Sequence, residues 1–158
     1  KMTYNINRVH FQKPESINSN FFLVDQKQTE NYNILIVAFF GEYPDGSSGN
    51  EHAEYIAAIS LLGLQAFNAD CIVLDFRELS YHWGDSILDV FGDIHQFKND
   101  KTNPNEPPFP IIVVSSSKSS GLLSLITEYG ENRPDWHFFD MVKAIDYAIE
   151  KAKEWLNS

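Results

Sequence analysis

The chain has 158 residues, of which 43% are hydrophobic and 22% charged, and this composition excludes a disordered or fibrous protein. Twelve Lys and Arg against twenty-two Asp and Glu give a net charge of −10, which disfavours nucleic acid and anionic membranes as partners. Because Cys71 is the single cysteine and neither a leader nor a long apolar run is evident, we expect a soluble, cytoplasmic protein without an internal disulfide.

The first 40 residues are expected to form three strands. Residues 4–11 alternate loosely between apolar and polar side chains, so they suit the edge of a sheet. Residues 21–24 form a short apolar run, and residues 33–40 are nearly all apolar. A strand that is hydrophobic on both faces is typical of a sheet covered by helices on both sides, so residues 33–40 should be central.

The next segments predict a helix, a strand and a loop. Residues 51–67 place apolar side chains three and four positions apart, which indicates a helix, and Asn50 stands where its N-cap should be. The apolar residues 71–76 predict a core strand. Residues 77–84 are mostly polar or aromatic and are expected to form a loop.

A second helix should begin at Asp85 or Ser86, since either side chain can act as an N-cap. Its buried side is expected to carry Ile87, Leu88, Phe91 and Ile94. Residues 99–109 contain three prolines and predict an exposed connection. A core strand over residues 110–115 and a short helix over residues 121–129 should follow.

The C-terminal segment has the strongest helical pattern, with Asp140 as its expected N-cap. The apolar stripe of this helix is Val142, Ile145, Ile149, Ala152 and Leu156. Alternating strands and helices predict parallel strands joined by crossovers. We therefore expect one α/β domain over residues 1–158, with a central mixed, mostly parallel sheet, flanking helices and an antiparallel hairpin at its N-terminus.

The negative charge is concentrated in the middle of the chain. Residues 28–97 hold eleven acids and one base, Arg77, so this stretch accounts for the whole net charge of −10. Acidic surface also serves solubility, but a field of one sign over half a domain would attract a basic partner.

Within this stretch, the loop after residues 71–76 and the helix that follows are the expected partner-binding surface. Tyr and Trp are enriched at binding hot spots, and acids at positions 85, 89 and 93 repeat every four residues along one side of the helix. The residues of the expected surface are Glu78, Tyr81, His82, Trp83, Asp85, Asp89 and Asp93. The alternative is that Tyr81 and Trp83 only cover the edge of the sheet.

Motifs for catalysis, metals and cofactors are weak. Neither a phosphate-binding glycine loop nor a His and Cys spacing for zinc occurs, so no cofactor or metal is expected. A hydrolase or crotonase-like enzyme remains an alternative, with Ser86 or residues 115–117 as nucleophile, His82 as base, and Asp75 or Asp85 to orient it. Asp75 and Glu78 could instead pair as two carboxylates, although Asp75 is more often bonded to neighbouring loop amides.

Residues 71–156 resemble a STAS domain, the fold of anti-sigma-factor antagonists. The resemblance rests on Leu74-Asp75, the aromatic residues 81–83, Asp85-Ser86, the strand 111–114, and Phe139-Asp140 with Ala144-Ile145. It implies a protein-binding signalling module. In that family the Ser after Asp can be the phosphorylated switch, which here implies Ser86.

By size, acidity and the lack of catalytic motifs, the chain is also similar to the immunity proteins of bacterial polymorphic toxins, which neutralise a basic toxin by binding it. The function expected from the sequence is therefore an acidic inhibitor or immunity protein whose partner is a basic protein, such as a toxin or nuclease. The STAS-like module switched at Ser86 and the enzyme are the alternatives. The sequence leaves the oligomeric state open.

Overall fold

The computed structural model describes residues 2–127 and 132–158 of the chain. Its strands are β1 (Ile17–Leu23), β2 (Ile34–Glu42), β3 (Cys71–Ser80), β4 (Ile111–Val114) and β5 (His137–Phe138). Its α-helices are α1 (Asn50–Ala66), α2 (Leu88–Lys98), α3 (Ser120–Ile126) and α4 (Met141–Leu156), and the short 3-10 helices η1 (Gly46–Gly49) and η2 (Ser117–Ser119) precede α1 and α3. Glu128 and Tyr129, the last residues of the expected helix 121–129, lie outside the described residues.

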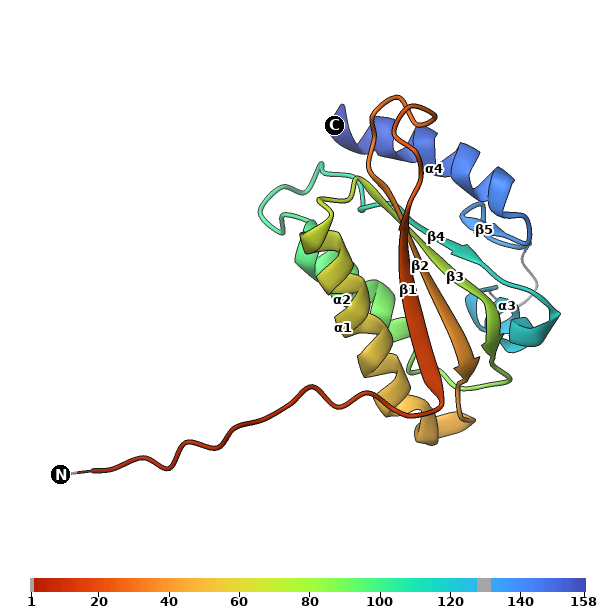
Figure 1. Cartoon of the computed structure of the whole chain (residues 1–158). Coiled ribbons are helices and arrows are strands. Elements are labelled where there is room, and N and C mark those ends of the chain that lie inside the picture. Colours follow the sequence, from red (N-terminus) through yellow and green to blue (C-terminus); the bar gives the residue numbers. More distant parts are fainter. Residues whose placement is uncertain (1, 128–131) are drawn as a thin grey trace.

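The five strands form one sheet in the order β1-β2-β3-β4-β5. β1 runs antiparallel to β2, whereas β2, β3, β4 and β5 are mutually parallel. Connections through α1, α2 and α3 join the parallel strands, because parallel neighbours need a long crossover. The expected α/β fold, with a central mixed sheet between helices and an antiparallel hairpin at the N-terminal side, is confirmed (Figure 1).

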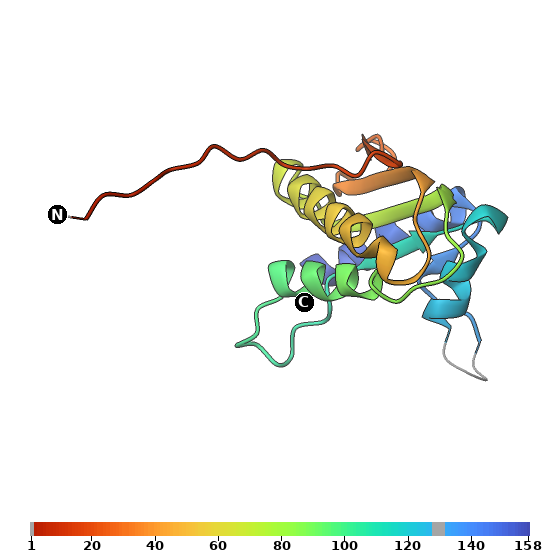
Figure 2. The same ribbon diagram turned by 90° about the horizontal axis from the view of Figure 1, so that it is seen from below.

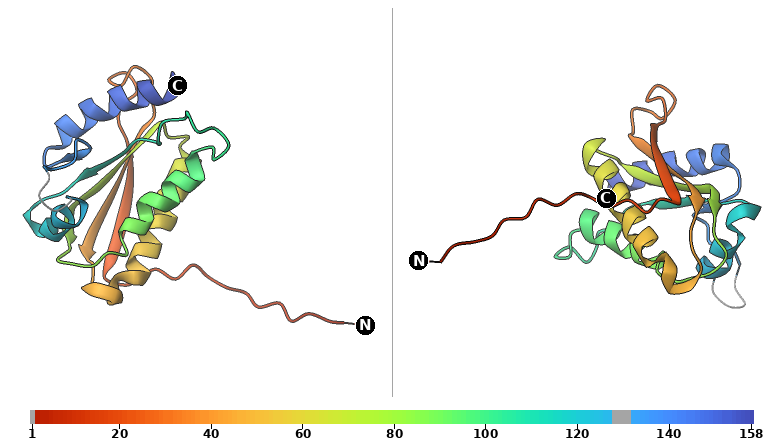
Figure 3. Two further views of the ribbon diagram at one scale, coloured as in Figure 1. Left: turned by 180° about the vertical axis from the view of Figure 1, so that it is seen from behind. Right: turned by 60° about the horizontal axis from the view of Figure 1, so that its bottom comes forward.

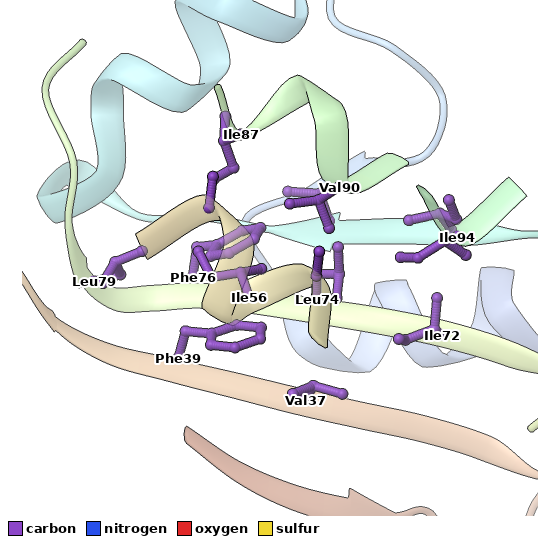
Figure 4. Close-up of a cluster of buried hydrophobic side chains, with 14 of the residues drawn as sticks. Val37, Phe39, Ile56, Ile72, Leu74, Phe76, Leu79, Ile87, Val90 and Ile94 are labelled. Atoms are coloured by element: carbon purple, nitrogen blue, oxygen red, sulfur yellow. The ribbon is translucent and has the colours of Figure 1, made fainter. Parts of the chain in front are cut away.

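Two helices, α1 and α2, lie side by side over one face of the sheet (Figures 1 and 2). Ile56 of α1 and Val90 and Ile94 of α2 are buried against sheet residues such as Leu74 and Phe76 (Figure 4). Alternate residues of each parallel strand point to this face, and the others point to the opposite face. Both sets are apolar, which is why the strands read as continuous hydrophobic runs.

The opposite face is covered by α4, which packs through small residues. Ala144, Ala148 and Ala152 are fully buried against a layer that includes Cys71 and Val73 of β3. Alanines spaced four apart form one side of a helix and let its backbone approach the sheet closely. Asp140 caps α4 as expected, since its Oδ1 accepts a hydrogen bond from Val142 N at 2.9 Å.

The apolar stripe expected on α4 is wrong in part. Val142 is 67% exposed, Leu156 is also exposed, and Ile145 and Ile149 are only half-buried. Only Ala152 of the expected stripe is fully buried. Large side chains could not fit where the helix lies against the strands, so they border the contact instead of forming it.

The N-terminal part of the chain differs from the expectation. Residues 4–11 form no strand but belong to an exposed, extended arm that leaves the body of the protein (Figure 1). β1 is instead Ile17–Leu23, longer than the expected residues 21–24, and it occupies the sheet edge. An alternating pattern makes a strand only where a neighbouring strand supplies backbone hydrogen bonds, and residues 4–11 have none.

β3 is longer than the apolar run that predicted it. It continues through the charged Arg77 and Glu78 to Ser80, where a loop was expected. The pairing with β2 shifts by one residue, from Ala38 opposite Asp75 to Phe40 opposite Glu78. This bulge lets the strand continue while Arg77 turns back to Asp75, so the polar residues do not interrupt the sheet.

The N-caps expected for α1 and α2 are wrong. Gly49 occupies the N-cap position of α1, and Ile87 that of α2, and neither position has a side-chain cap. Each helix is entered through a tight turn of i to i+3 bonds, as in Leu88 N to Asp85 O at 3.0 Å. In this turn the first backbone N–H groups of α2 already donate to backbone carbonyls, so the side chain of Ser86 is not needed as a cap and can form another hydrogen bond.

Candidate functional site

The candidate site is a groove between α1 and α2, on the side of these helices away from the sheet core. It has a volume of about 590 Å³. Its lining comes from α1, from the turn before α2 and from α2: Asn50, Ala53, Glu54, Ser86, Leu88, Asp89, Gly92, Asp93 and Gln96. The lining includes two residues with small side chains, Ala53 and Gly92, and the space next to Gly92 is open.

The groove is strongly acidic. Glu54 lies on α1, and Asp89 and Asp93 lie one helical turn apart on α2. Within the described ranges, ion pairs join Arg77 to Asp75, Lys118 to Glu78, Lys151 to Glu154 and Lys153 to Glu30, and none reaches these three carboxylates. Three uncompensated carboxylates on facing helices repel one another, so they lower the stability of the protein unless a cation or basic partner is bound.

Three of the eight surface and switch residues expected from the sequence line this groove: Ser86, Asp89 and Asp93. Asp85, His82 and Trp83 are exposed in the loop that leads into α2, and Trp83 is 62% exposed. The indole of Trp83 lies against Gly46, whose N–H donates to Trp83 O at 3.2 Å. This contact fixes the loop beside the groove, with an aromatic ring on its surface.

Tyr81 belongs to the core and not to the binding surface. It is 1% exposed, and its ring packs against Tyr43 with 4.9 Å between ring centroids. Its hydroxyl donates a hydrogen bond to Gly84 O, and burial raises its pKa to about 12, with a smaller contribution from Asp85. A side chain that closes the core cannot also anchor a partner, so this part of the sequence expectation is wrong.

Glu78 lies apart from the groove, near the carboxyl end of β3. Its exposed carboxylate is 3.8 Å from Lys118 Nζ. Exposed pairs of this kind contribute little to stability.

The groove residues that α1 supplies, Asn50, Ala53 and Glu54, were not expected from the sequence. The four-residue spacing of Asn50 and Glu54 on a predicted helix indicates that they share a side of that helix. Which helix that side faces follows only from the tertiary structure.

The expected catalytic groups do not come together. Ser86 Oγ bonds to Asn50 Oδ1 and not to His82. Ser115 Oγ lies 2.6 Å from His137 Nε2, a pair that the sequence did not suggest. Both residues are buried, so a substrate could not reach the hydroxyl. Burial, with a smaller contribution from Arg133, lowers the pKa of His137 to about 4.

Asp75 does not pair with a second carboxylate. Its Oδ1 and Oδ2 each accept a hydrogen bond from the Arg77 guanidinium at 2.9 Å, and Oδ1 also accepts from Arg77 N at 3.1 Å. This bidentate contact raises the pKa of Arg77. The expected bond from a neighbouring amide to Asp75 is therefore present, and the Arg77 guanidinium adds a bidentate ion pair.

Neither a metal centre nor a membrane span is found among residues 2–127 and 132–158. No three His, Cys, Asp or Glu side chains of this part of the chain are placed so that they could hold a metal ion. Its helices are all too short or too polar to cross a membrane.

No protein-family model and no curated protein matches the chain. Among solved structures, an anti-sigma factor antagonist from Mycobacterium paratuberculosis is similar, with a TM-score of 0.49 and 15% sequence identity over 87% of this chain and 98% of that one.

Proposed function

We propose that this chain is a protein-binding module that holds a basic segment of a partner protein in the groove between α1 and α2. The observation that carries the proposal is the set of three carboxylates, Glu54, Asp89 and Asp93, which face a common groove without a cation of their own in the described part of the chain. Lys and Arg side chains would neutralise them, and the net charge of −10 would steer such a partner towards this surface.

The groove also offers apolar contacts. Leu88 on its wall is exposed, and Trp83 presents its indole in the adjoining loop. Aromatic anchors near the centre of an interface contribute most of the binding energy, while surrounding charges set the rate of association and the specificity. The partner class that fits is a basic protein, such as a toxin or nuclease, which the chain would inhibit by covering its basic surface.

A direct test uses a 12-residue peptide of alternating Arg and Leu as the probe, titrated into the full chain and followed by backbone amide shifts in NMR. We expect saturable binding with shifts at the α1 and α2 groove. The triple variant Glu54→Gln, Asp89→Asn and Asp93→Asn should bind about tenfold or more weakly, because each lost charge contact contributes on the order of 0.5–1 kcal/mol.

The matched control removes three exposed carboxylates elsewhere, through Glu15→Gln, Asp146→Asn and Glu150→Gln. It changes the net charge equally and should bind the peptide nearly as well as the unmodified chain. An equal loss of binding in both variants would mean that bulk charge, and not the groove, attracts the peptide.

A second candidate function is a STAS-like switch at Ser86, favoured by its position. Ser86 is half-buried on the groove wall, and its hydroxyl contacts Asn50 across the two helices. A phosphate there would break this contact and add negative charge beside Asp89. Mass spectrometry of the chain from its native cell would test this, and Ser86 recovered wholly unmodified under all conditions would speak against the switch.

A further inference from the structure

The N-terminal arm, residues 2–10, is an unusual feature of this protein. It is extended and fully exposed, and it points away from the body in every view (Figures 1, 2 and 3). Its large apolar side chains lie in solvent, with Ile6 94% exposed and Val9 84% exposed. The arm becomes attached only at Phe11, whose ring lies 6.0 Å from that of Tyr55 on α1.

The arm also differs from the rest of the chain in charge. Residues 2–10 contain one base, Arg8, and no acid, whereas residues 11–158 contain ten bases and twenty-two acids, a net charge of −12. An apolar segment with one positive charge is complementary in charge to such an acidic body. Its free backbone amides and carbonyls also remain available for pairing with a strand.

A second feature without a binding partner lies on the side of the molecule opposite the arm, along the part of the β4 edge that β5 does not pair with. An apolar slot of about 590 Å³ lies there, between α2 and α4. Its aromatic lining consists of Phe91, Phe109, Trp136, Tyr147 and Trp155. Its polar groups are few, and they include Lys151 and Glu154 of α4, which pair with each other at 3.1 Å.

The slot reaches an unpaired part of the sheet. β5 is two residues long and pairs only with Val113 and Val114. The amides of Val113 and Ser115 donate to the β5 side, and alternation directs Ile111 to the same side. In the described part of the chain, no backbone group bonds Ile111 on that side, so its N–H and C=O face the slot.

Tyr4 and Ile6 cannot reach the slot of their own chain. Tyr4 lies seven residues before Phe11, where the arm is attached, and seven extended residues reach at most about 25 Å. The arm starts on the β1 side, whereas the slot lies at the far side of a sheet of five strands, about 19 Å away in the direction of pairing. A path from the arm to the slot must also pass over α1 and α2, each about 10 Å thick. The path is therefore longer than the extended arm.

We propose that the arm of one copy binds in the slot of a second copy, so that two chains form an arm-exchanged dimer. The arm lies extended beside Ile111 as a short added strand, with Tyr4 and Ile6 in the aromatic slot. Arg8 follows Ile6 on the same side of the arm and reaches the exposed carboxylate of Glu154 at the rim.

The area buried is sufficient for a stable dimer. Tyr4, Ile6 and Arg8, which share one side of the arm, would each bury on the order of 100–150 Å², so that two arms bury roughly 800 Å² and the two slots a similar area. The sum lies in the range of about 1,200–2,000 Å² typical of specific interfaces. This inference is independent of the proposed function, because none of the groove carboxylates takes part.

The first test is sedimentation velocity of the full chain between about 1 and 100 µM. We expect a concentration-dependent dimer. The variant Tyr4→Asp with Ile6→Asp changes two exposed residues, so it should fold normally and dimerise at least about tenfold more weakly. The control Asn5→Asp with Asn7→Asp adds the same charge to the same arm but keeps the apolar side chains, and it should remain dimeric.

The second test locates the contact. A peptide of residues 2–12 is titrated into the Tyr4→Asp, Ile6→Asp chain, which also carries Trp83→Phe so that the fluorescence comes from Trp136 and Trp155. We expect saturable binding that changes this fluorescence and survives Glu54→Gln, Asp89→Asn and Asp93→Asn. A monomer at all concentrations, an arm protected within a monomer, or peptide binding that the groove variant abolishes would each overturn the proposal.

Discussion

At the scale of single residues, His137 is a buried ionisable group with a side-chain partner. It is fully buried, and Ser115 holds its Nε2 at 2.6 Å. Because burial lowers its pKa from about 6.5 to about 4, the unfolded chain takes up a proton in this interval and the folded chain does not. Stability is therefore fully present above pH 6.5 and is lost as the pH falls towards 4.

We expect the free energy of unfolding to fall by about 2 kcal/mol between pH 7 and pH 5 from His137 alone. The lowered pKa of His52 adds to the effect in the same direction. Urea unfolding at pH 7, 6 and 5 measures the change, and His137→Gln should remove most of it. The control is His82→Gln, which removes an exposed imidazole instead of the buried one. Equal slopes for all three proteins would refute the assignment to His137.

At the scale of elements, the contact between α4 and the sheet depends on the size of three alanines. Ala148→Leu would place three more carbon atoms where the helix backbone lies close to the strands. We expect a loss of about 1–3 kcal/mol in the free energy of unfolding, measured by urea titration. The exposed Val142 is the control, and Val142→Leu should stay within about 0.5 kcal/mol of the unmodified chain. No loss for Ala148→Leu would indicate space beneath α4.

The same helix shows what sequence can and cannot predict. Its period and its Asp140 cap are local properties, so its position was predictable. Its buried side was predicted wrongly. Large apolar side chains such as Ile149 and Leu156 were expected to be buried, whereas the helix lies so close to the sheet that only small side chains such as Ala144 and Ala148 fit between them. The strand expected over residues 4–11 failed for a related reason, since alternation does not reveal whether a neighbouring strand exists.

At the scale of the whole molecule, the uncompensated charge should be visible in stability. Replacing Glu54, Asp89 and Asp93 by their amides should raise the free energy of unfolding by about 1 kcal/mol at 20 mM NaCl, because like charges on α1 and α2 no longer repel. Urea titrations at 20 and 500 mM NaCl check this, and the difference should shrink at high salt as the charges are screened. A variant less stable than the unmodified chain would show that these carboxylates make favourable contacts instead.

The location of the candidate site was predictable only in part at this scale. Charge counting identified residues 28–97 and with them Asp89 and Asp93, whereas Ser86 followed from the resemblance to STAS domains. Glu54 joins them because α1 and α2 pack side by side, and nothing in their separate sequences indicates which sides meet. Tyr81 was assigned to the surface because tyrosine is enriched at binding hot spots, whereas its ring is buried in the core against Tyr43.

Cys71 gives the fold a chemical reporter. It is the one cysteine of the chain, it lies fully buried at the start of the central strand, and burial raises the pKa of its thiol. The thiolate is the reactive form, so the folded protein shields this sulfur both from contact and from ionisation. A thiol reagent in excess would label the chain only when β3 separates from α4, and the labelling rate would then measure how often the middle of the sheet opens.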